Sequence, residues 1–219
     1  RYPLVTGVQT CALPILVDFL VQKKYLKSEA VTEAFREITR ADFVPAQFER
    51  EAEADIPLPI GFGQTISQPT IVATMLELLD LGPKQTVLDI GSGSGWTSAL
   101  IGRIVGDTGK VVALERLPEL RALSGKNIEK FGLVSAGIVE CLEGDGHGGC
   151  PKHEPYDRIL VSAGTDEVPL SLKNQLAIGG KMVIPLNNHL SYIERKSEKE
   201  FYREDFPGFS FSPLIQKSF

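Results

Sequence analysis

The sequence predicts an α/β fold in which helices cover both faces of a doubly wound, mostly parallel sheet. From residue 87 to residue 184, short apolar strand-like runs alternate with helix-like segments, as parallel sheets require. A glycine-rich turn follows the first of these strands, where the backbone must turn sharply. The 219 residues, 42% of them hydrophobic, suffice for one substantial core. We therefore expect a single domain.

The segment before the alternating pattern predicts a helical cap and an ordered loop. An amphipathic helix is expected where three apolar residues recur at helical spacing: Val31, Phe35 and Ile38. Prolines exclude a regular helix from residues 55–60, and residues 61–69 are expected to form an ordered loop. Pro69 fits the first turn of the next helix, which would bury Ile71, Val72, Met75, Leu78 and Leu79.

The alternating part predicts a Rossmann-like arrangement of strands and helices. The expected strands are residues 87–90, 111–114, 138–141, 158–161 and 181–184, and the expected helices are residues 96–105, 120–131 and 170–176. The tail is expected to add a late antiparallel strand pair, residues 190–195 and 209–215, joined by a charged hairpin.

The domain prediction sets the first residues apart. Residues 1–15 resemble the translation of a sequencing adapter, so we exclude them from the fold prediction. Residues 16–219 are expected to form one domain. Within it, residues 16–80 make the cap and loop, residues 81–186 the ligand-binding core, and residues 187–219 the late strands.

Composition excludes several classes of protein. The net charge of −5 gives no basic stripe for nucleic acid. The apolar run at residues 12–21 is too short and interrupted to cross a bilayer, so we expect a cytoplasmic protein without membrane partners, and a monomer. The three cysteines and three histidines show no metal-ligand spacing, and we expect no metal: Cys11, Cys141, Cys150, His147, His153 and His189.

A carboxylate at the glycine turn indicates which ligand the turn would hold. Asp89 stands beside Gly91, Ser92 and Gly93, where it would repel a pyrophosphate but attract the ammonium and sulfonium groups of S-adenosylmethionine. The spacing G-x-G-x-G also lacks the third glycine of the dinucleotide fingerprint. The alternative is a plain strand-to-helix turn that binds nothing.

Two further acids fall at strand ends, where open α/β sheets bind their ligands. Glu115 could accept both ribose hydroxyls, because a carboxylate offers two oxygens. Asp145, before Gly146, could accept the adenine amino group. A single acid in such a place is more often a turn former or cap, but three in successive strands favour a ligand site.

This order of glycine loop and acids resembles the class I S-adenosylmethionine-dependent methyltransferases over residues 86–185. The loop Gly-x-Gly-Gln-Thr-Ile-Ser-Gln-Pro, before an apolar helix, is similar to the substrate loop of the protein-L-isoaspartate O-methyltransferase family. Other strings shared with that family are Phe43-Val44-Pro45, Leu58-Pro59-Ile60, Gly144-Asp145-Gly146, Gln175-Leu176, Gly179-Gly180, Ile184-Pro185-Leu186 and Phe211-Ser212-Pro213-Leu214. The resemblance spans residues 16–215.

The resemblance implies methyl transfer to the free carboxylate of L-isoaspartyl residues, with D-aspartyl residues as a second acceptor, in damaged proteins and peptides. The ester would then collapse to a succinimide and partly return to aspartate, which is protein repair. It also assigns the active-site role to Ser67, and Gln64, Thr65 and Ile66 would join it in binding the substrate.

Residue chemistry agrees with such an acceptor. A carboxylate is ionised at neutral pH, so methyl transfer to it needs no general base. The Ser67 hydroxyl could donate to one carboxylate oxygen and aim the other at the methyl carbon, and the helix N-terminus at Pro69 would favour an anion. The competing interpretation is that Ser67 only caps that helix.

Other functions stay open on the sequence alone. One is a class I methyltransferase with a small-molecule or RNA acceptor, although Ser162-Ala163-Gly164 stands where amino-group methylation expects an Asn/Asp-Pro-Pro-aromatic motif. Others are a protein that binds S-adenosylmethionine or damaged protein chains without turnover, and an NAD oxidoreductase. The run His147-Gly148-Gly149-Cys150 departs from the family, many of whose members have a bulky aromatic residue there.

Overall fold

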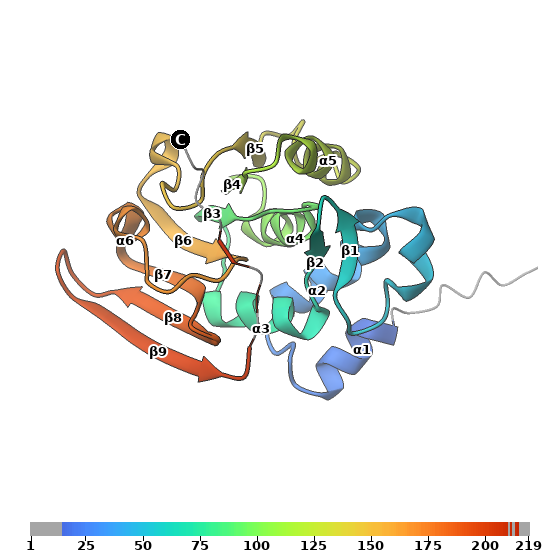
Figure 1. The fold of residues 1–219 in the computed structure, drawn as a ribbon, viewed down its shortest axis with the longest axis horizontal. Helices are drawn as coiled ribbons and strands as arrows, with labels where there is room; N and C mark the ends of the chain where they lie inside the picture. The colour runs from blue at the N-terminus through green and yellow to red at the C-terminus, as the bar shows by residue number, and fades with distance from the viewer. Residues whose placement is uncertain (1–14, 210, 212, 215–219) are drawn as a thin grey trace, which may run out of the picture.

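A seven-stranded sheet forms the centre of the structure (Figure 1). The computed structural model describes residues 15–209, 211, 213 and 214. In this part of the chain the strand order is β5-β4-β3-β6-β7-β8-β9, with parallel pairing from β5 to β7 and antiparallel pairing from β7 to β9. The strand order reverses between β3 and β6, because the chain adds β4 and β5 on one side of β3 and then β6 and β7 on the other. Open α/β sheets bind ligands beyond the strand ends at such a reversal. The predicted fold class is confirmed.

The core elements follow the predicted order. The strands are β3 (Thr86–Ile90), β4 (Lys110–Glu115), β5 (Val139–Glu143), β6 (Tyr156–Val161) and β7 (Leu176–Leu186), and the helices are α3 (Pro69–Leu79), α4 (Trp96–Val105), α5 (Pro118–Glu129) and α6 (Leu170–Gln175), with the 3-10 helix η3 (Pro151–His153) before β6. β7 starts earlier than expected because Leu176 already pairs with Tyr156. Within the described residues, no helix combines the length and apolar character that a bilayer span requires.

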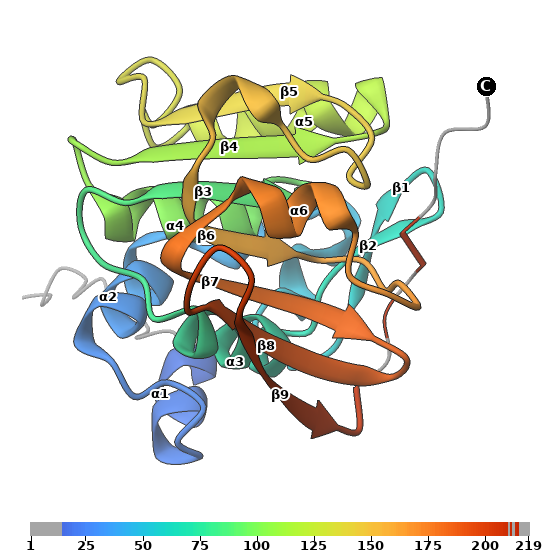
Figure 2. The same ribbon diagram turned by 90° about the vertical axis from the view of Figure 1, so that its left-hand side faces the viewer.

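Side chains of the central strands alternate between two cores, as the two-residue period of a strand requires. From β3, Val87 packs into the core that contains α3, α4 and α5, whereas Leu88 and Ile90 pack into the core beside α6. Val111 and Val112 of β4 divide in the same way. Figure 2 shows α6 in front of the sheet with α4 and α5 behind it. This alternation decides which face each strand-end residue can reach.

The N-terminal segment forms the predicted helical cap. Its elements are α1 (Ile15–Gln22), α2 (Glu29–Glu37), η1 (Arg40–Phe43) and η2 (Ala46–Glu51). α2 buries Val31 and Phe35, and the Phe35 ring meets the Trp96 ring edge-on with centroids 5.4 Å apart. Ile38, directly after α2, is also buried, so the expected amphipathic helix is confirmed. Residues 1–14 and Cys11 lie outside the described residues, and the boundary after residue 15 stays a prediction.

Two segments differ from the sequence prediction. The expected loop at residues 61–69 includes an antiparallel hairpin of β1 (Leu58–Gly61) and β2 (Gln64–Ile66), because Pro59 lies in a two-stranded sheet that tolerates a missing donor. In the tail, the predicted antiparallel pair is formed by β8 (His189–Arg195) and β9 (Phe201–Pro207), so its second strand lies earlier in the chain than the predicted residues 209–215. Hydrogen bonding in register with β8 places β9 at the edge of the sheet.

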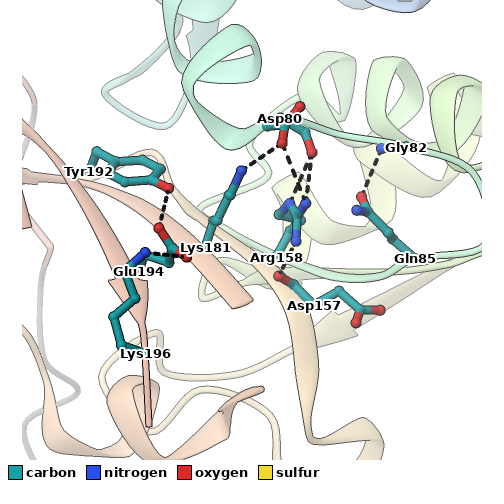
Figure 3. Close-up of polar contacts among 9 residues, drawn as sticks. All are labelled: Asp80, Gly82, Gln85, Asp157, Arg158, Lys181, Tyr192, Glu194 and Lys196. Carbon is teal, nitrogen blue, oxygen red and sulfur yellow. Dashed lines mark hydrogen bonds and ion pairs between the residues drawn. The ribbon is translucent and has the colours of Figure 1, made fainter. Parts of the chain in front are cut away.

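A polar cluster connects the C-terminal end of α3 to side chains of β6, β7 and β8 (Figure 3). The guanidinium group of Arg158 donates to the Asp80 carbonyl from Nε and Nη2 (3.1 and 2.9 Å), and Lys181 Nζ lies 2.6 Å from Asp80 Oδ2. Glu194 continues the cluster, with Lys196 Nζ at 2.8 Å and the Tyr192 hydroxyl at 3.2 Å. These donors satisfy a helix end whose last carbonyls have no partner inside the helix. The cluster fixes α3 at the end opposite its first turn.

Candidate active site

A cavity of about 560 Å³ opens at the carboxyl ends of the parallel strands. Three parts of the chain line it: the β1–β2 hairpin with the first turn of α3, the turns that follow β3, β4, β5 and β6, and residues near the C-terminus. It lies at the reversal of the sheet, where the sequence predicts the ligand site. Among the described residues, no group of three or more histidine, cysteine or acidic side chains could hold a metal ion.

The glycine turn after β3 is shaped by backbone conformations that favour glycine. Gly91, Gly93 and Gly95 have φ of +79°, +55° and +94°. A Cβ on Gly95 would lie 2.9 Å from Ile128 of α5, so the turn also needs the close approach of α5. Gly91 and Gly93 line the cavity as predicted, whereas Ser92 is 7% exposed and lies outside the lining. The role of Ser92 in binding the cofactor stays a prediction, which its main chain would have to serve, since its side chain is buried.

Glu115 holds the glycine turn from the end of β4. One carboxylate oxygen accepts from the N–H of Gly93 at 2.9 Å, and the other accepts from the N–H of Leu117 at 3.0 Å. The side chain lines the cavity although the residue is only 8% exposed. Each oxygen keeps a further lone pair, so the carboxylate can still accept hydroxyl donors from a bound ligand.

Asp89 lies behind the cavity and not in it. Its residue is completely buried, its Oδ2 accepts from the Ser98 hydroxyl of α4 at 2.5 Å, and its Oδ1 has no hydrogen-bond partner among the described residues. The reason is the strand period, because Asp89 falls on the Val87 side of β3, towards α4. Burial raises the pKa of Asp89 to about 7, and the negative charge of Glu115 adds to the rise, while the Ser98 bond opposes it. The predicted attraction of ammonium and sulfonium groups by Asp89 stays a prediction, and it would have to act from behind the glycine turn.

We expect the D89N variant to change how stability depends on pH. Because the folded protein holds the Asp89 proton up to about pH 7 and the unfolded chain releases it near the ordinary value of 3.8, wild-type stability falls as pH rises through this window. Asparagine does not ionise and removes that fall. As pH rises from about 5 to about 8, the free energy of unfolding of D89N should increase by about 2–3 kcal/mol relative to that of wild type, as measured by urea unfolding. Replacing the exposed Asp18 by asparagine is the matched control, and parallel profiles for wild type and D89N would contradict the expectation.

The turn after β5 brings glycines to the cavity and turns Asp145 towards His147. Gly144 and Gly146 line the cavity, and a Cβ on Gly146 would lie 2.5 Å from Ile90, so backbone approaches closely here. Asp145 is not among the lining residues. Its Oδ1 accepts from the His147 N–H at 2.9 Å and lies 3.2 Å from the ring Nδ1. The predicted acceptor for an adenine amino group thus stands beside the cavity, already engaged by the residue that departs from the family pattern.

Three of the four predicted substrate residues line the cavity. Gln64, Thr65 and Ser67 do so, and no hydrogen bond of the Ser67 hydroxyl is found within the described residues. Ile66 does not, because the alternation of β2 turns its side chain into the core, where it is 5% exposed. The role of Ile66 in binding the substrate stays a prediction, which its main chain and not its buried side chain would serve.

The first turn of α3 is capped by an acid from another segment. Gln68 is the N-cap residue and makes no side-chain cap bond, so Ser67 does not cap the helix. Asp55 does this from a distance: its Oδ1 accepts from the Thr70 N–H at 2.9 Å and its Oδ2 from Gln68 Nε2 at 3.1 Å. This carboxylate offsets part of the positive charge at the start of the helix, and the attraction of an anion by that end stays a prediction.

The C-terminal wall of the cavity was not predicted as part of the site. Phe209, Phe211, Pro213 and Leu214 line the cavity, and the Leu214 N–H donates to the Gly164 carbonyl at 2.6 Å. The string Phe211-Ser212-Pro213-Leu214, shared with the family, was the available signal. Its position at the site depends on a long-range contact that local pattern does not show.

Comparison with known proteins identifies relatives over nearly the whole chain. The family model for protein-L-isoaspartate(D-aspartate) O-methyltransferase matches residues 14–218. A protein-L-isoaspartate O-methyltransferase of Methanopyrus kandleri is 44% identical over 204 residues, covering 91% of this chain and 89% of the relative. One of Aeropyrum pernix is 46% identical over 204 residues, covering 91% of this chain and 78% of the relative.

Solved structures agree in fold. A structure described as a protein-L-isoaspartate O-methyltransferase from Plasmodium falciparum in complex with S-adenosyl-L-homocysteine has a TM-score of 0.82 at 22% identity, covering 94% of this chain and 99% of that one. Another structure named protein-L-isoaspartate O-methyltransferase has a TM-score of 0.80 at 29% identity, covering 92% of this chain and 65% of that one. With the sequence matches over residues 14–218, the chain belongs to the protein-L-isoaspartate(D-aspartate) O-methyltransferase family.

Proposed function

We propose that this protein transfers a methyl group from S-adenosylmethionine to the free carboxylate of L-isoaspartyl residues, and of D-aspartyl residues, in damaged proteins and peptides. The observation that carries the proposal is one cavity lined both by the glycine turn with Glu115 and by the hydroxyl-bearing loop at Thr65 and Ser67. Family membership supports the same reaction.

The residues at the glycine turn fit the methyl donor. When bound, S-adenosylmethionine supplies a methyl group on a positively charged sulfur. Glu115 offers two acceptor oxygens for ribose hydroxyls, and Gly91, Gly93 and Gly146 bring main chain without side chains to the cavity wall. Asp89 acts from beneath the turn, where it holds the start of α4 through Ser98.

The acceptor side needs positioning and no general base. A carboxylate substrate is ionised at neutral pH and is itself the nucleophile. Among the described lining residues there is no histidine or lysine, and Glu115 already accepts two backbone hydrogen bonds. We propose that the Ser67 hydroxyl donates to one carboxylate oxygen and leaves the other free to react, with Gln64 and Thr65 beside it.

A labelling assay tests the proposal. The protein is incubated with S-adenosylmethionine labelled in its methyl group and with two peptides that differ only in an isoaspartyl or an aspartyl linkage. We expect base-labile label on the isoaspartyl peptide alone. Equal labelling of both peptides would contradict the acceptor, and labelling of RNA or of a small molecule instead would favour the alternative methyltransferase. The cytoplasmic location and the monomeric state stay predictions.

A further inference from the structure

Arg40 is a buried cation whose two terminal nitrogens donate to main-chain carbonyls of the substrate side, whereas its Nε has no hydrogen-bond partner among the described residues. It lies in η1 with 2% of its surface exposed. Nη1 donates to the carbonyls of Ala52 and Ala54 at 3.0 and 3.2 Å, and Nη2 donates to those of Ile56 and Ser67 at 2.8 and 3.1 Å. One guanidinium group therefore joins the segment before the hairpin to the residue with the candidate catalytic hydroxyl.

The segment held by Arg40 is also held to the first turn of α3. Asp55 lies between two of the carbonyls that Arg40 binds, and its carboxylate accepts from Gln68 and Thr70. Ser67 thus stands between an Arg40 bond on its own carbonyl and an Asp55 bond on the next residue. Both contacts fix the main chain that carries the Ser67 hydroxyl.

The guanidinium group also lies over the first residue of the helix that follows the glycine turn. The carbon atom of the Arg40 guanidinium lies 5.4 Å from the centroid of the Trp96 ring. Trp96 is the first residue of α4, directly after Gly95, and is itself fixed by a hydrogen bond from its indole nitrogen to the Ile38 carbonyl at 3.3 Å. Arg40 therefore touches the supports of both halves of the cavity.

We propose that Arg40 is a positioning residue, which sets the Ser67 hydroxyl relative to the glycine turn by tying the Ser67 carbonyl, the segment at residues 52–56 and the Trp96 ring to one rigid group. The proposal rests on the proposed function of the cavity. Arg40 does not line the cavity and so does not touch the substrate.

The burial of the Arg40 charge is weak evidence that this residue serves only to stabilise the fold. Moving a cation out of water is costly, and apolar groups of similar volume often replace buried ions without loss of stability. Burial lowers the pKa of Arg40 to about 10, with Asp55 and Glu53 opposing that fall, so the group stays charged at neutral pH. What the guanidinium adds over an apolar side chain is a planar fork with donors in fixed directions.

The test compares R40K and R40M with wild type in the isoaspartyl-peptide assay. Both variants lose the fork, and lysine keeps the charge on a single nitrogen that cannot serve all four carbonyls. Calorimetric titration with S-adenosylhomocysteine counts the working binding sites, and kcat is calculated per site. We expect this kcat to fall on the order of 10- to 100-fold and the peptide KM to rise by about fivefold or more. The dissociation constant for S-adenosylhomocysteine should stay within about threefold of wild type.

The control is R103M, which removes an exposed cation that joins α4 to Glu37 of α2 without reaching the Ser67 segment. We expect its kinetic constants to match those of wild type. The inference is overturned if R40K behaves as wild type, if the rate loss only follows the number of binding sites with an unchanged peptide KM, or if R103M shows the same change in kcat and KM. If wild type methylates no isoaspartyl peptide, the proposed function itself fails, and the role of Arg40 falls with it.

Discussion

Alanine at position 67 is expected to remove most of the turnover while leaving the methyl donor bound. The Ser67 hydroxyl lines the cavity and, among the described residues, makes no hydrogen bond, so its donor is available to an incoming carboxylate. Loss of a single positioning hydrogen bond at a reacting group lowers kcat on the order of 100-fold. Steady-state kinetics with the isoaspartyl peptide, together with calorimetric titration of S-adenosylmethionine, measure the two effects separately.

The conservative variant S67T serves as the control for S67A. Threonine keeps a hydroxyl group at the same carbon, so part of the rate should return in this variant. The Ser67 carbonyl that binds Arg40 is unchanged in both variants. A wild-type kcat in S67A, or a loss of donor affinity as large as the loss of rate, would contradict a role for this hydroxyl in orienting the acceptor.

The E115A variant is expected to lose affinity for S-adenosylmethionine by on the order of 100-fold or more. Removal of the carboxylate deletes the proposed acceptors for two ribose hydroxyls. It also leaves the N–H groups of Gly93 and Leu117 without their partner, so the glycine turn loses its support. Calorimetric titration with S-adenosylhomocysteine gives the affinity directly, because this product analogue does not react.

Two substitutions separate the possible causes of that loss. E115Q keeps one acceptor oxygen and should lose less affinity than E115A. E119A removes an exposed carboxylate from the first turn of α5 and should leave the affinity unchanged. The prediction for Glu115 is wrong if E115A binds the product analogue as tightly as E119A does.

Most of the fold could be predicted because the signals are local. The strand at Val87–Ile90, the turn with Gly91, Gly93 and Gly95, and the helix after it each depend on residues next to one another in the chain. The second strand of the late antiparallel pair is Phe201–Pro207 and not the predicted residues 209–215. Three charged residues interrupt the apolar pattern of Phe201–Pro207, and its register with β8 places it at the sheet edge, which a one-dimensional pattern does not show.

The site could be predicted in its location and less well in its detail. Strand ends gave the positions of Glu115 and Gly91, but the face that a strand-end side chain reaches depends on register, which turns Asp89 towards α4 and Ile66 into the core. The contacts of Arg40 with Ser67 and of Asp55 with Thr70 join residues from separate elements. No local spacing of residues indicates such contacts, so they could not be derived from the sequence.

The wall formed by Phe209, Phe211, Pro213 and Leu214 has a consequence for biosynthesis. A nascent polypeptide that has emerged from the ribosome as far as the end of β7 already contains every parallel strand. It still lacks the residues that form one side of the cavity. The binding site can be complete only after translation has passed Leu214, so a shortened chain that keeps all the parallel strands would still lack one wall of the site.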